Sequence, residues 1–579
     1  MAPSDAPGSA VPPAAESPAQ NGGAGEPGVP ASPIPNPDPD AAVEADARRP
    51  ASAPEITDDP GWYHPAGLAL VAFAFALSAL APLYEMDLAQ HLATGEWIVR
   101  HHAVPFTEPF AWTRAGQPYF AYSWLAQLVF YGLLRAGGPW ALHLLEGVLV
   151  GASVASALWA GRHLRWRPAT RLTVALLQLA LLWGVANTLR PQQVLLIVIP
   201  LAWGLTARVR DRGAGARELL GLAAVGALAA NTHVFFPLTA APFAFYLFAE
   251  GGWRRWWPAL GALVIGWLLT PYALAWPQIF GLNFGHSVLL RRPPSIKEFI
   301  PGFEYWWRQW GVMVAVAALL VAPWLVSDRL RPLRARIVTG VLWAAGLGMF
   351  AYAGRLVFVW WALAFLLLGV AVERAADVIA PLLRRPFDRA IVVGVATIVL
   401  VVCAPAPRPD LWAFEGDTVH RMLPRAGEQP ALWLPGWLIC HTHASAAGRI
   451  FTEFNYGTEL NWRLPGYSPS IDGRTIFPDS DAQEFAFMLY GARTRHATTW
   501  THADLALLDR TTWLVPTIAR DPAWVLLAES GPGWRAGAAL WARKQWWQRW
   551  GTPTRIPALN LMPGDPRGMC PAQGVFPKP

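Results

Sequence analysis

The stretch from Tyr84 to Gln127 concentrates the side chains that could take part in chemistry. It holds acids and histidines among many aromatic residues: Glu85, Asp87, His91, His101, His102 and Glu108. From Asp87 onward the spacing is helical, so Asp87, His91 and Thr94 share one face at i, i+4 and i+7. The apolar Leu88, Leu92 and Val99 fall on another face. The stretch therefore predicts an amphipathic surface helix with its polar face toward a cavity.

Acids and cations in this pattern suggest chemistry on a phosphate. An acidic pair such as Glu85 and Asp87 could act as a general base for a hydroxyl group, or hold a divalent cation against a phosphate. Guanidinium groups suit bidentate phosphate contacts, and the candidate cations are Arg190, Arg292, Lys297 and Arg355. A plainer interpretation stays open, in which Asp87 caps its helix and pairs with Arg190 or Arg355 to hold the fold.

Other common catalytic signatures are missing from the sequence. There is no GxxxxGK[ST] motif, no GxGxxG between a strand and a helix, and no GxSxG nucleophile elbow. His441 and His443 beside Cys440 could bind zinc, but no second Cys/His cluster at metal spacing completes such a site. Three cysteines are too few for a disulfide framework, although Cys440 and Cys570 could pair outside the cytoplasm.

The composition places these residues in a membrane protein. Hydrophobic residues make up 54% of the chain and charged residues only 15%, against roughly 25% charged in soluble domains. Several apolar runs approach the roughly 20 residues that cross a bilayer. The 33 Trp residues fit belts at the membrane interface, and they could also line a groove for lipid or sugar.

Hydropathy and charge together predict the membrane topology. We expect eleven spans at about 66–84, 139–161, 170–187, 191–209, 217–231, 234–250, 255–275, 310–327, 337–352, 355–373 and 388–406, with a surface helix at 123–135. Five arginine clusters then fall on one side, near residues 162–171, 208–217, 254–255, 329–336 and 374–389. The positive-inside rule makes that side cytoplasmic. The first loop and the C-terminal region are therefore expected outside.

Two further regions flank the predicted transmembrane domain, which covers residues 61–406 with its first outer loop at 85–138. Residues 1–60, rich in Pro, Ala and acids, predict a disordered cytoplasmic tail. Residues 407–579 predict an extracytoplasmic α/β or α+β domain, with strands at 431–435, 449–454, 512–517, 524–529 and 539–544. The last two strands form a predicted hairpin, and residues 504–511 predict a helix.

A resemblance adds to this interpretation. The run from Asp87 through His91 to Gly95 and the segments that follow it resemble the GT-C superfamily of membrane glycosyltransferases, in particular a bacterial polytopic group. The matching segments are 87–95, 104–105, 108–110, 113, 116–118, 124–127, 190–192, 231–233, 271–272, 297–298, 454–457, 462–466 and 472–474. The resemblance covers roughly residues 66–545.

The resemblance implies a mainly α, GT-C-like bundle in the bacterial cytoplasmic (inner) membrane. It implies transfer of a sugar from a polyprenyl-phosphate donor to an extracytoplasmic lipid, glycan or protein, and no nucleic acid. Asp87 would be the general base or a ligand of Mg²⁺ or Mn²⁺, with Glu85 and His91 beside it. The other expected site residues are Arg190, Gln192, Asn231, His233, Lys297 and Arg355 for the donor phosphate, and Trp97, Trp112 and Trp124 for stacking.

A second class of function stays open from the sequence. The chain could keep this fold without turnover, as a scaffold or translocation partner in envelope glycan assembly. The altered acidic motif Glu85-Met86-Asp87 and the polar C-terminal domain, which could dock partners, favour that alternative.

Overall fold

The computed structural model describes most of the chain between residues 65 and 551. The described residues are 65–80, 86–185, 189–284, 316–323, 333–383, 438, 441–443, 445–464, 466–472, 474, 499–529 and 538–551. The predicted tail at 1–60, the span at 388–406, the strand at 431–435, Glu85, Lys297 and Cys570 lie outside these residues. So does most of the predicted span at 310–327.

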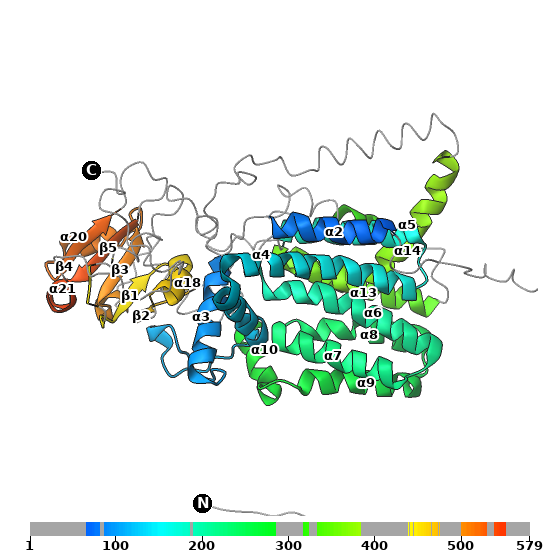
Figure 1. Ribbon diagram of the computed structural model, residues 1–579, viewed down its shortest axis with the longest axis horizontal. Coiled ribbons are helices and arrows are strands. Elements are labelled where there is room, and N and C mark those ends of the chain that lie inside the picture. The colour runs from blue at the N-terminus through cyan, green and yellow to red at the C-terminus, as the bar shows by residue number, and fades with distance from the viewer. Residues whose placement is uncertain are drawn as a thin grey trace, which may run out of the picture. The chain divides into compact units, whose positions relative to one another are not determined.

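The part before residue 384 is helical (Figure 1). Its α-helices are α2 (Pro65–Ala79), α3 (Met86–His101), α4 (Trp124–His163), α5 (Pro168–Val185), α6 (Leu195–Arg212), α7 (Ala216–Thr232), α8 (Ala241–Glu250), α9 (Trp253–Leu268), α10 (Trp276–Phe284), α13 (Leu333–Tyr352) and α14 (Val357–Leu383). Short 3₁₀ turns join several of them: η2 (Trp112–Arg114), η3 (Pro191–Val194), η4 (Phe236–Ala240), η5 (Ala273–Ala275) and η7 (Gly354–Leu356).

Several of these helices are long and apolar enough to cross a bilayer. Within the described residues four qualify: α4, η3 with α6, α13, and α14 as far as Asp377. A fifth is added if α9 and the following η5–α10 segment, bent by 99°, count as one broken span. Helices α2 and α5 are shorter but apolar. The protein is therefore a multi-pass membrane protein, and the count of eleven spans stays a prediction.

The first loop forms the predicted helix, although Val99 of its predicted apolar face is 40% exposed. Helix α3 buries Leu88 and Leu92 against Phe130 and Tyr131 of α4. The two helices approach closely at Gly95, where an added Cβ would lie 2.3 Å from the carbonyl oxygen of Gln127.

Helix α4 contains both the predicted surface helix and the predicted span that follows it. The two parts are divided by a kink at Gly138, whose φ of 64° suits glycine, just before Pro139.

Ion pairs join the helix ends that carry the arginine clusters. Arg165, after α4, contacts Asp211 of α6 at 3.1 Å. Arg167, before α5, contacts Glu373 and Asp377 of α14 at 3.2 and 2.5 Å. The loops after α4 and α6 and the later part of α14 thus meet at one end of the bundle, as the predicted topology requires.

The C-terminal part contains a five-stranded mixed sheet (Figure 1). Its strands are β1 (Gly448–Thr452), β2 (Tyr467–Pro469), β3 (Leu505–Asp509), β4 (Trp524–Glu529) and β5 (Ala538–Arg543), in the order β2-β1-β3-β5-β4. β1 is parallel to β2 and β3, whereas β5 is antiparallel to β3 and β4. The helices of this part are α18 (Phe454–Arg463), η10 (Thr499–His502), α20 (Val515–Arg520) and α21 (Lys544–Trp550).

Three of the predicted strands and their hairpin are confirmed, and two assignments are wrong. Residues 505–509, predicted as helix, form β3. The prediction is wrong because a strand buried on both faces shows no polar–apolar alternation that would distinguish it from a buried helix. Residues 512–517, predicted as strand, contain the start of α20, where Pro516 lies in the first turn and suits a helix N-terminus.

The sheet domain packs on the first loop. Helix α18 lies against α3, and its Trp462 joins the apolar cluster formed by α3 and α4. From the loop, Trp112 donates to the carbonyl of Ile450 at 3.4 Å, and Thr113 donates to the carbonyl of Ser470. Residues from the sheet domain can therefore reach the polar face of α3.

Candidate active site

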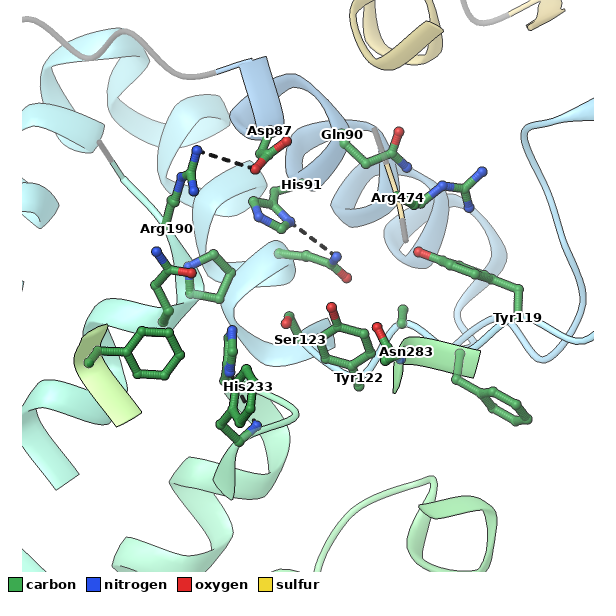
Figure 2. A pocket seen from close by; sticks show the side chains of 17 residues that line it. Asp87, Gln90, His91, Tyr119, Tyr122, Ser123, Arg190, His233, Asn283 and Arg474 are labelled. Carbon is green, nitrogen blue, oxygen red and sulfur yellow. Dashed lines mark hydrogen bonds and ion pairs between the residues drawn. The ribbon is translucent and has the colours of Figure 1, made fainter. Parts of the chain in front are cut away.

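A polar cavity of about 140 Å³ lies beside the start of α3 (Figure 2). Its walls come from α3, the loop before α4, the first turn of α4, η3, the turn after α7, α10 and α14, and one residue of the sheet domain. The lining side chains that can donate or accept hydrogen bonds or protons are Asp87, Gln90, His91, Tyr119, Tyr122, Ser123, Gln127, Arg190, Gln192, His233, Asn283 and Arg474. The fold thus brings together residues spread over almost 400 positions.

Asp87 and Arg190 lie side by side in the wall of this cavity (Figure 2). Arg190 Nη2 lies 3.5 Å from Asp87 Oδ2, with side-chain exposures of 15% and 43%. Asp87 stands in the first turn of α3, where the helix dipole favours a negative charge. The predicted pairing is therefore present, and the carboxylate lines the cavity.

His91 lies one helical turn after Asp87, in surroundings that disfavour its protonated form. Burial, and then the charge of Arg190, lower the pKa of the imidazole to about 3. Its Nδ1 lies 3.3 Å from Nε2 of Gln127, a pairing in which the amide donates to the neutral ring (Figure 2). A base this weak is better suited to orienting a hydroxyl group than to removing its proton.

Arg190 is positioned by the turn that follows it. It adopts an extended conformation before Pro191, as residues preceding proline do. In the same turn Gln193 donates through Nε2 to Glu146 Oε1 of α4 at 2.7 Å, and both residues are fully buried. A hydrogen bond inside the bundle therefore fixes the turn that carries Arg190.

His233 marks the place where the polar cavity meets an apolar one. Its ring stacks on Phe235 with centroids 5.5 Å apart and an interplanar angle of 15°. Phe235 also lines a second cavity of about 470 Å³, which is almost wholly apolar. That second cavity is bordered by η4, α8, α10, α13 and α14. The guanidinium of Arg190, the imidazole of His233 and the apolar cavity are thus arranged one after another.

The sheet domain completes the polar cavity with Arg474. Its guanidinium donates to Glu108 at 2.8 and 2.7 Å and to Asp472 at 2.7 and 2.5 Å. Burial disfavours the charge of Arg474, but Asp472 and Glu108 outweigh burial and raise the pKa of the guanidinium. The cation lies 4.7 Å from the ring centroid of Tyr119. Arg474 falls in segment 472–474, which is part of the resemblance described above, but the resemblance assigned no role to Arg474.

The loop before α4 is held by Tyr272, from the predicted Pro271-Tyr272 match. Its hydroxyl donates to the carbonyl of Pro105 at 2.9 Å and accepts from the amide of Ala121 at 3.2 Å. These bonds place Tyr122 and Ser123 at the wall of the cavity.

Three predicted residues serve packing in the structure. Asn231 accepts from Trp124 Nε1 at 2.7 Å and donates to the carbonyls of Ala227 and Leu269. Neither Asn231 nor Trp124 lines the polar cavity. Trp112 packs in the contact with the sheet domain, under Arg449 at 5.6 Å.

The remaining predicted residues lie elsewhere. Trp97 lines a separate groove further along α3. Arg355 belongs to η7, three residues before the cavity-lining Phe358, and its side chain lies outside the described parts of the chain. Glu85 and Lys297 lie outside the described residues altogether.

The resemblance implies that Asp87 is either the general base or a ligand of a divalent metal ion. Within the described ranges, no three His, Cys, Asp or Glu side chains are grouped to hold one. A metal requirement therefore stays a prediction, and no chemical step below depends on it.

Comparison with known proteins gives weak likenesses, all of them among solved structures. No protein-family model and no curated protein matches the chain. Among solved structures, it is similar to ArnT from Cupriavidus metallidurans bound to undecaprenyl phosphate, at 16% sequence identity and a TM-score of 0.48. The match covers 83% of this chain and 98% of that one. A likeness at this level does not assign the chain to a family.

Proposed function

We propose that this protein is a membrane glycosyltransferase that moves a sugar from a polyprenyl-phosphate donor to an extracytoplasmic acceptor. The observation that carries the proposal is the arrangement of one acid, one cation and one apolar groove. Asp87 lies 3.5 Å from Arg190 in a polar cavity, and that cavity adjoins an apolar cavity at Phe235.

The apolar cavity suits the lipid part of the donor. Its lining includes Phe235, Leu238, Phe280, Leu342 and Leu363, and it offers almost no polar surface. Burying apolar surface there contributes roughly 25 cal/mol per Å². A polyprenyl chain is hydrocarbon along its length, so it can use all of this lining.

The polar cavity suits the phosphate at the end of that chain. Arg190 is held at the cavity wall by η3, and its planar guanidinium can offer two parallel donors to phosphate oxygens. His233 stands beside Phe235, where the lipid would enter the polar region. Arg474 is engaged by two carboxylates, which makes Arg190 the better phosphate ligand.

The reaction follows from this placement. Asp87 accepts the proton of an acceptor hydroxyl, and the hydroxyl oxygen forms a bond to the anomeric carbon of the sugar. The bond from that carbon to the phosphate oxygen breaks, and its electron pair leaves with polyprenyl phosphate. Arg190 stabilises the charge that develops on the phosphate. Attack opposite the leaving group inverts the anomeric centre.

The membrane orientation forms part of the same proposal. The GT-C-like bundle would have eleven spans, with the cavity and the sheet domain outside the inner membrane and the N-terminus in the cytoplasm. Support comes from the arginine-bearing helix ends, which gather where Arg165 meets Asp211 and Arg167 meets Glu373. In the chain these ends alternate with the cavity-lining turns, as opposite sides of a membrane require.

The proposal is tested by measuring the binding of a polyprenyl phosphate to the detergent-solubilised protein. Arg190→Met should weaken binding roughly 10- to 100-fold, because a charge-assisted hydrogen bond contributes about 1.5–3 kcal/mol. The matched control is Arg165→Met, whose ion pair with Asp211 lies at the other end of α6. The same lipid without its phosphate should bind weakly to the unchanged protein. Equal binding of the two lipids, or normal binding by Arg190→Met, would contradict the assignment.

A further inference from the structure

A second groove, here called the outer groove, lies between α3 and the sheet domain. It has a volume of about 300 Å³, and its walls include Glu96, Trp97, Arg100, Phe110, Asn461 and Tyr467. None of these six residues lines the polar cavity beside Asp87. The groove therefore offers a separate binding surface, formed jointly by the first loop and the sheet domain.

We propose that the outer groove binds the saccharide part of the acceptor, at a distance from the hydroxyl group that receives the transferred sugar. This inference rests on the proposed glycosyltransferase function. It concerns binding of the acceptor, which the polar cavity proposed to hold the donor phosphate (here also called the donor cavity) leaves undefined.

The aromatic residues of the groove suit sugar rings. Trp97 is half-buried, and His101 stacks on it with centroids 4.1 Å apart and an interplanar angle of 13°. This contact fixes the plane of the indole, which combines a broad apolar surface with one N–H donor. Tyr467 and Phe110 add rings from β2 and from the loop. Carbon-bound hydrogens of a pyranose ring pack well on such surfaces.

The charged residues of the groove balance each other. Glu96 accepts from Arg100 Nη2 at 2.7 Å, and the carboxylate side chain is only 7% exposed. The pair cancels most of its net charge while leaving polar atoms for hydroxyl groups. This favours a ligand with many hydroxyls and little charge over a nucleotide or an anionic peptide.

Asn461 provides an unsatisfied acceptor. It is 6% exposed, and its Nδ2 donates to Gln90 Oε1 at 2.7 Å and to Asp472 Oδ2 at 2.9 Å. Its buried Oδ1 has no hydrogen-bond partner among the residues that the structure describes. A buried polar atom left unpaired carries a free-energy cost. A small rearrangement that brings a ligand hydroxyl to this oxygen would recover that cost.

The same residue connects the groove to the donor cavity. Gln90, which Asn461 contacts, lines the cavity that holds Asp87. Along α3 the ten residue steps from Asp87 to Trp97 span about 15 Å at 1.5 Å per step. A saccharide in the outer groove would thus direct another part of the acceptor past Gln90 toward Asp87. Its binding energy would help to orient the reacting hydroxyl.

The test uses the full-length protein and fluorescently labelled manno-, gluco- and galacto-oligosaccharides. Each is offered free, on an alkyl chain and on a short peptide, so that the arms separate glycan, lipid-linked and protein-linked acceptors. At least one saccharide should bind, and Trp97→Ala should weaken its binding about 10-fold or more. Trp97→Phe should recover part of the loss, since it keeps an aromatic surface. Glu96→Gln, which keeps the size of the side chain, should weaken binding as well.

The control is Trp513→Ala, which removes a 57% exposed tryptophan elsewhere in the sheet domain. Polyprenyl phosphate binding is measured on every variant and should stay within about twofold, because Trp97 does not line the donor cavity. The outer-groove proposal would be overturned if no saccharide bound, or if Trp97→Ala and Glu96→Gln left saccharide binding unaffected. In either case, normal binding of polyprenyl phosphate would leave the transferase proposal standing. Loss of phosphate-dependent lipid binding in the unchanged protein would instead mean that the proposed function itself fails.

Discussion

Arg474 and Glu108 lie 366 positions apart in the chain, yet the guanidinium of one donates two hydrogen bonds to the carboxylate of the other. The carboxylate side chains of Glu108 and Asp472 are fully buried, and the arginine side chain is 9% exposed. This ion triad joins the sheet domain to the first loop at the edge of the polar cavity. Each charge there depends on the others, because water is excluded.

Replacing the shared cation should therefore destabilise the protein strongly. Arg474→Met leaves two buried carboxylates uncompensated, and breaking a buried pair in this way costs about 3–5 kcal/mol. We expect a marked fall in thermal unfolding temperature in detergent. The exposed Arg520→Met in the same domain is the control and should change little. A stability equal to that of Arg520→Met would show that the triad does not hold the domain to the loop.

Glu146 should act on the donor site through Gln193. Glu146→Ala removes the acceptor of a buried hydrogen bond that fixes η3, the turn carrying Arg190. We expect weaker polyprenyl phosphate binding, whereas Glu146→Gln should recover much of it, since an amide oxygen can still accept from Gln193. Comparing the two variants by lipid binding at matched thermal stability separates positioning of Arg190 from general loss of fold. Equal defects in both variants would argue against a positioning role.

The stability of the sheet domain should depend on pH through Glu453. Burial raises the pKa of this carboxyl to about 7, although it accepts a hydrogen bond from the amide of Asp509 at 2.8 Å. Because this folded-state pKa lies above the ordinary carboxyl pKa of 4.5, the contribution of Glu453 to stability is full below pH 4.5 and is lost as the pH rises to 7. The loss is at most about 3 kcal/mol.

The variant Glu453→Gln isolates this effect. Between pH 4.5 and 7.5, the thermal unfolding temperature should fall with rising pH more steeply in the unchanged protein than in Glu453→Gln. Parallel pH profiles for the two proteins would show that Glu453 does not titrate in this range.

The sequence predicts the helical part well and the C-terminal part less well, for physical reasons. Helix α3 has one polar and one apolar face, and Gly138-Pro139 breaks α4, so periodicity and backbone chemistry locate both elements. Strand β3, by contrast, is buried along almost its whole length, and its run of apolar residues carries no period that separates strand from helix.

The candidate site shows the same division. Asp87, His91, Arg190, Gln192 and His233 line one cavity, as their placement between apolar runs suggested. Arg474 comes from a distant domain, and no local pattern shows that it would reach the loop. The roles of the aromatic residues are the hardest to predict, because a tryptophan that stacks on a sugar and one that donates a hydrogen bond to a neighbouring residue look alike in sequence. Trp124 donates to Asn231, a contact that only the packing of α4 against α7 reveals.

The most direct test of the central claim is the rate of sugar transfer by Asp87→Asn under single-turnover conditions. The substrates are a polyprenyl-phosphate sugar and an acceptor extract that supports transfer by the unchanged protein. The substitution keeps the size of the side chain but removes the base, so transfer should fall about 10²- to 10⁴-fold while polyprenyl phosphate still binds. Asp211→Asn, whose ion pairs lie at the opposite end of α6, should transfer normally. Transfer by Asp87→Asn at the wild-type rate would contradict the assignment of Asp87 as the catalytic base.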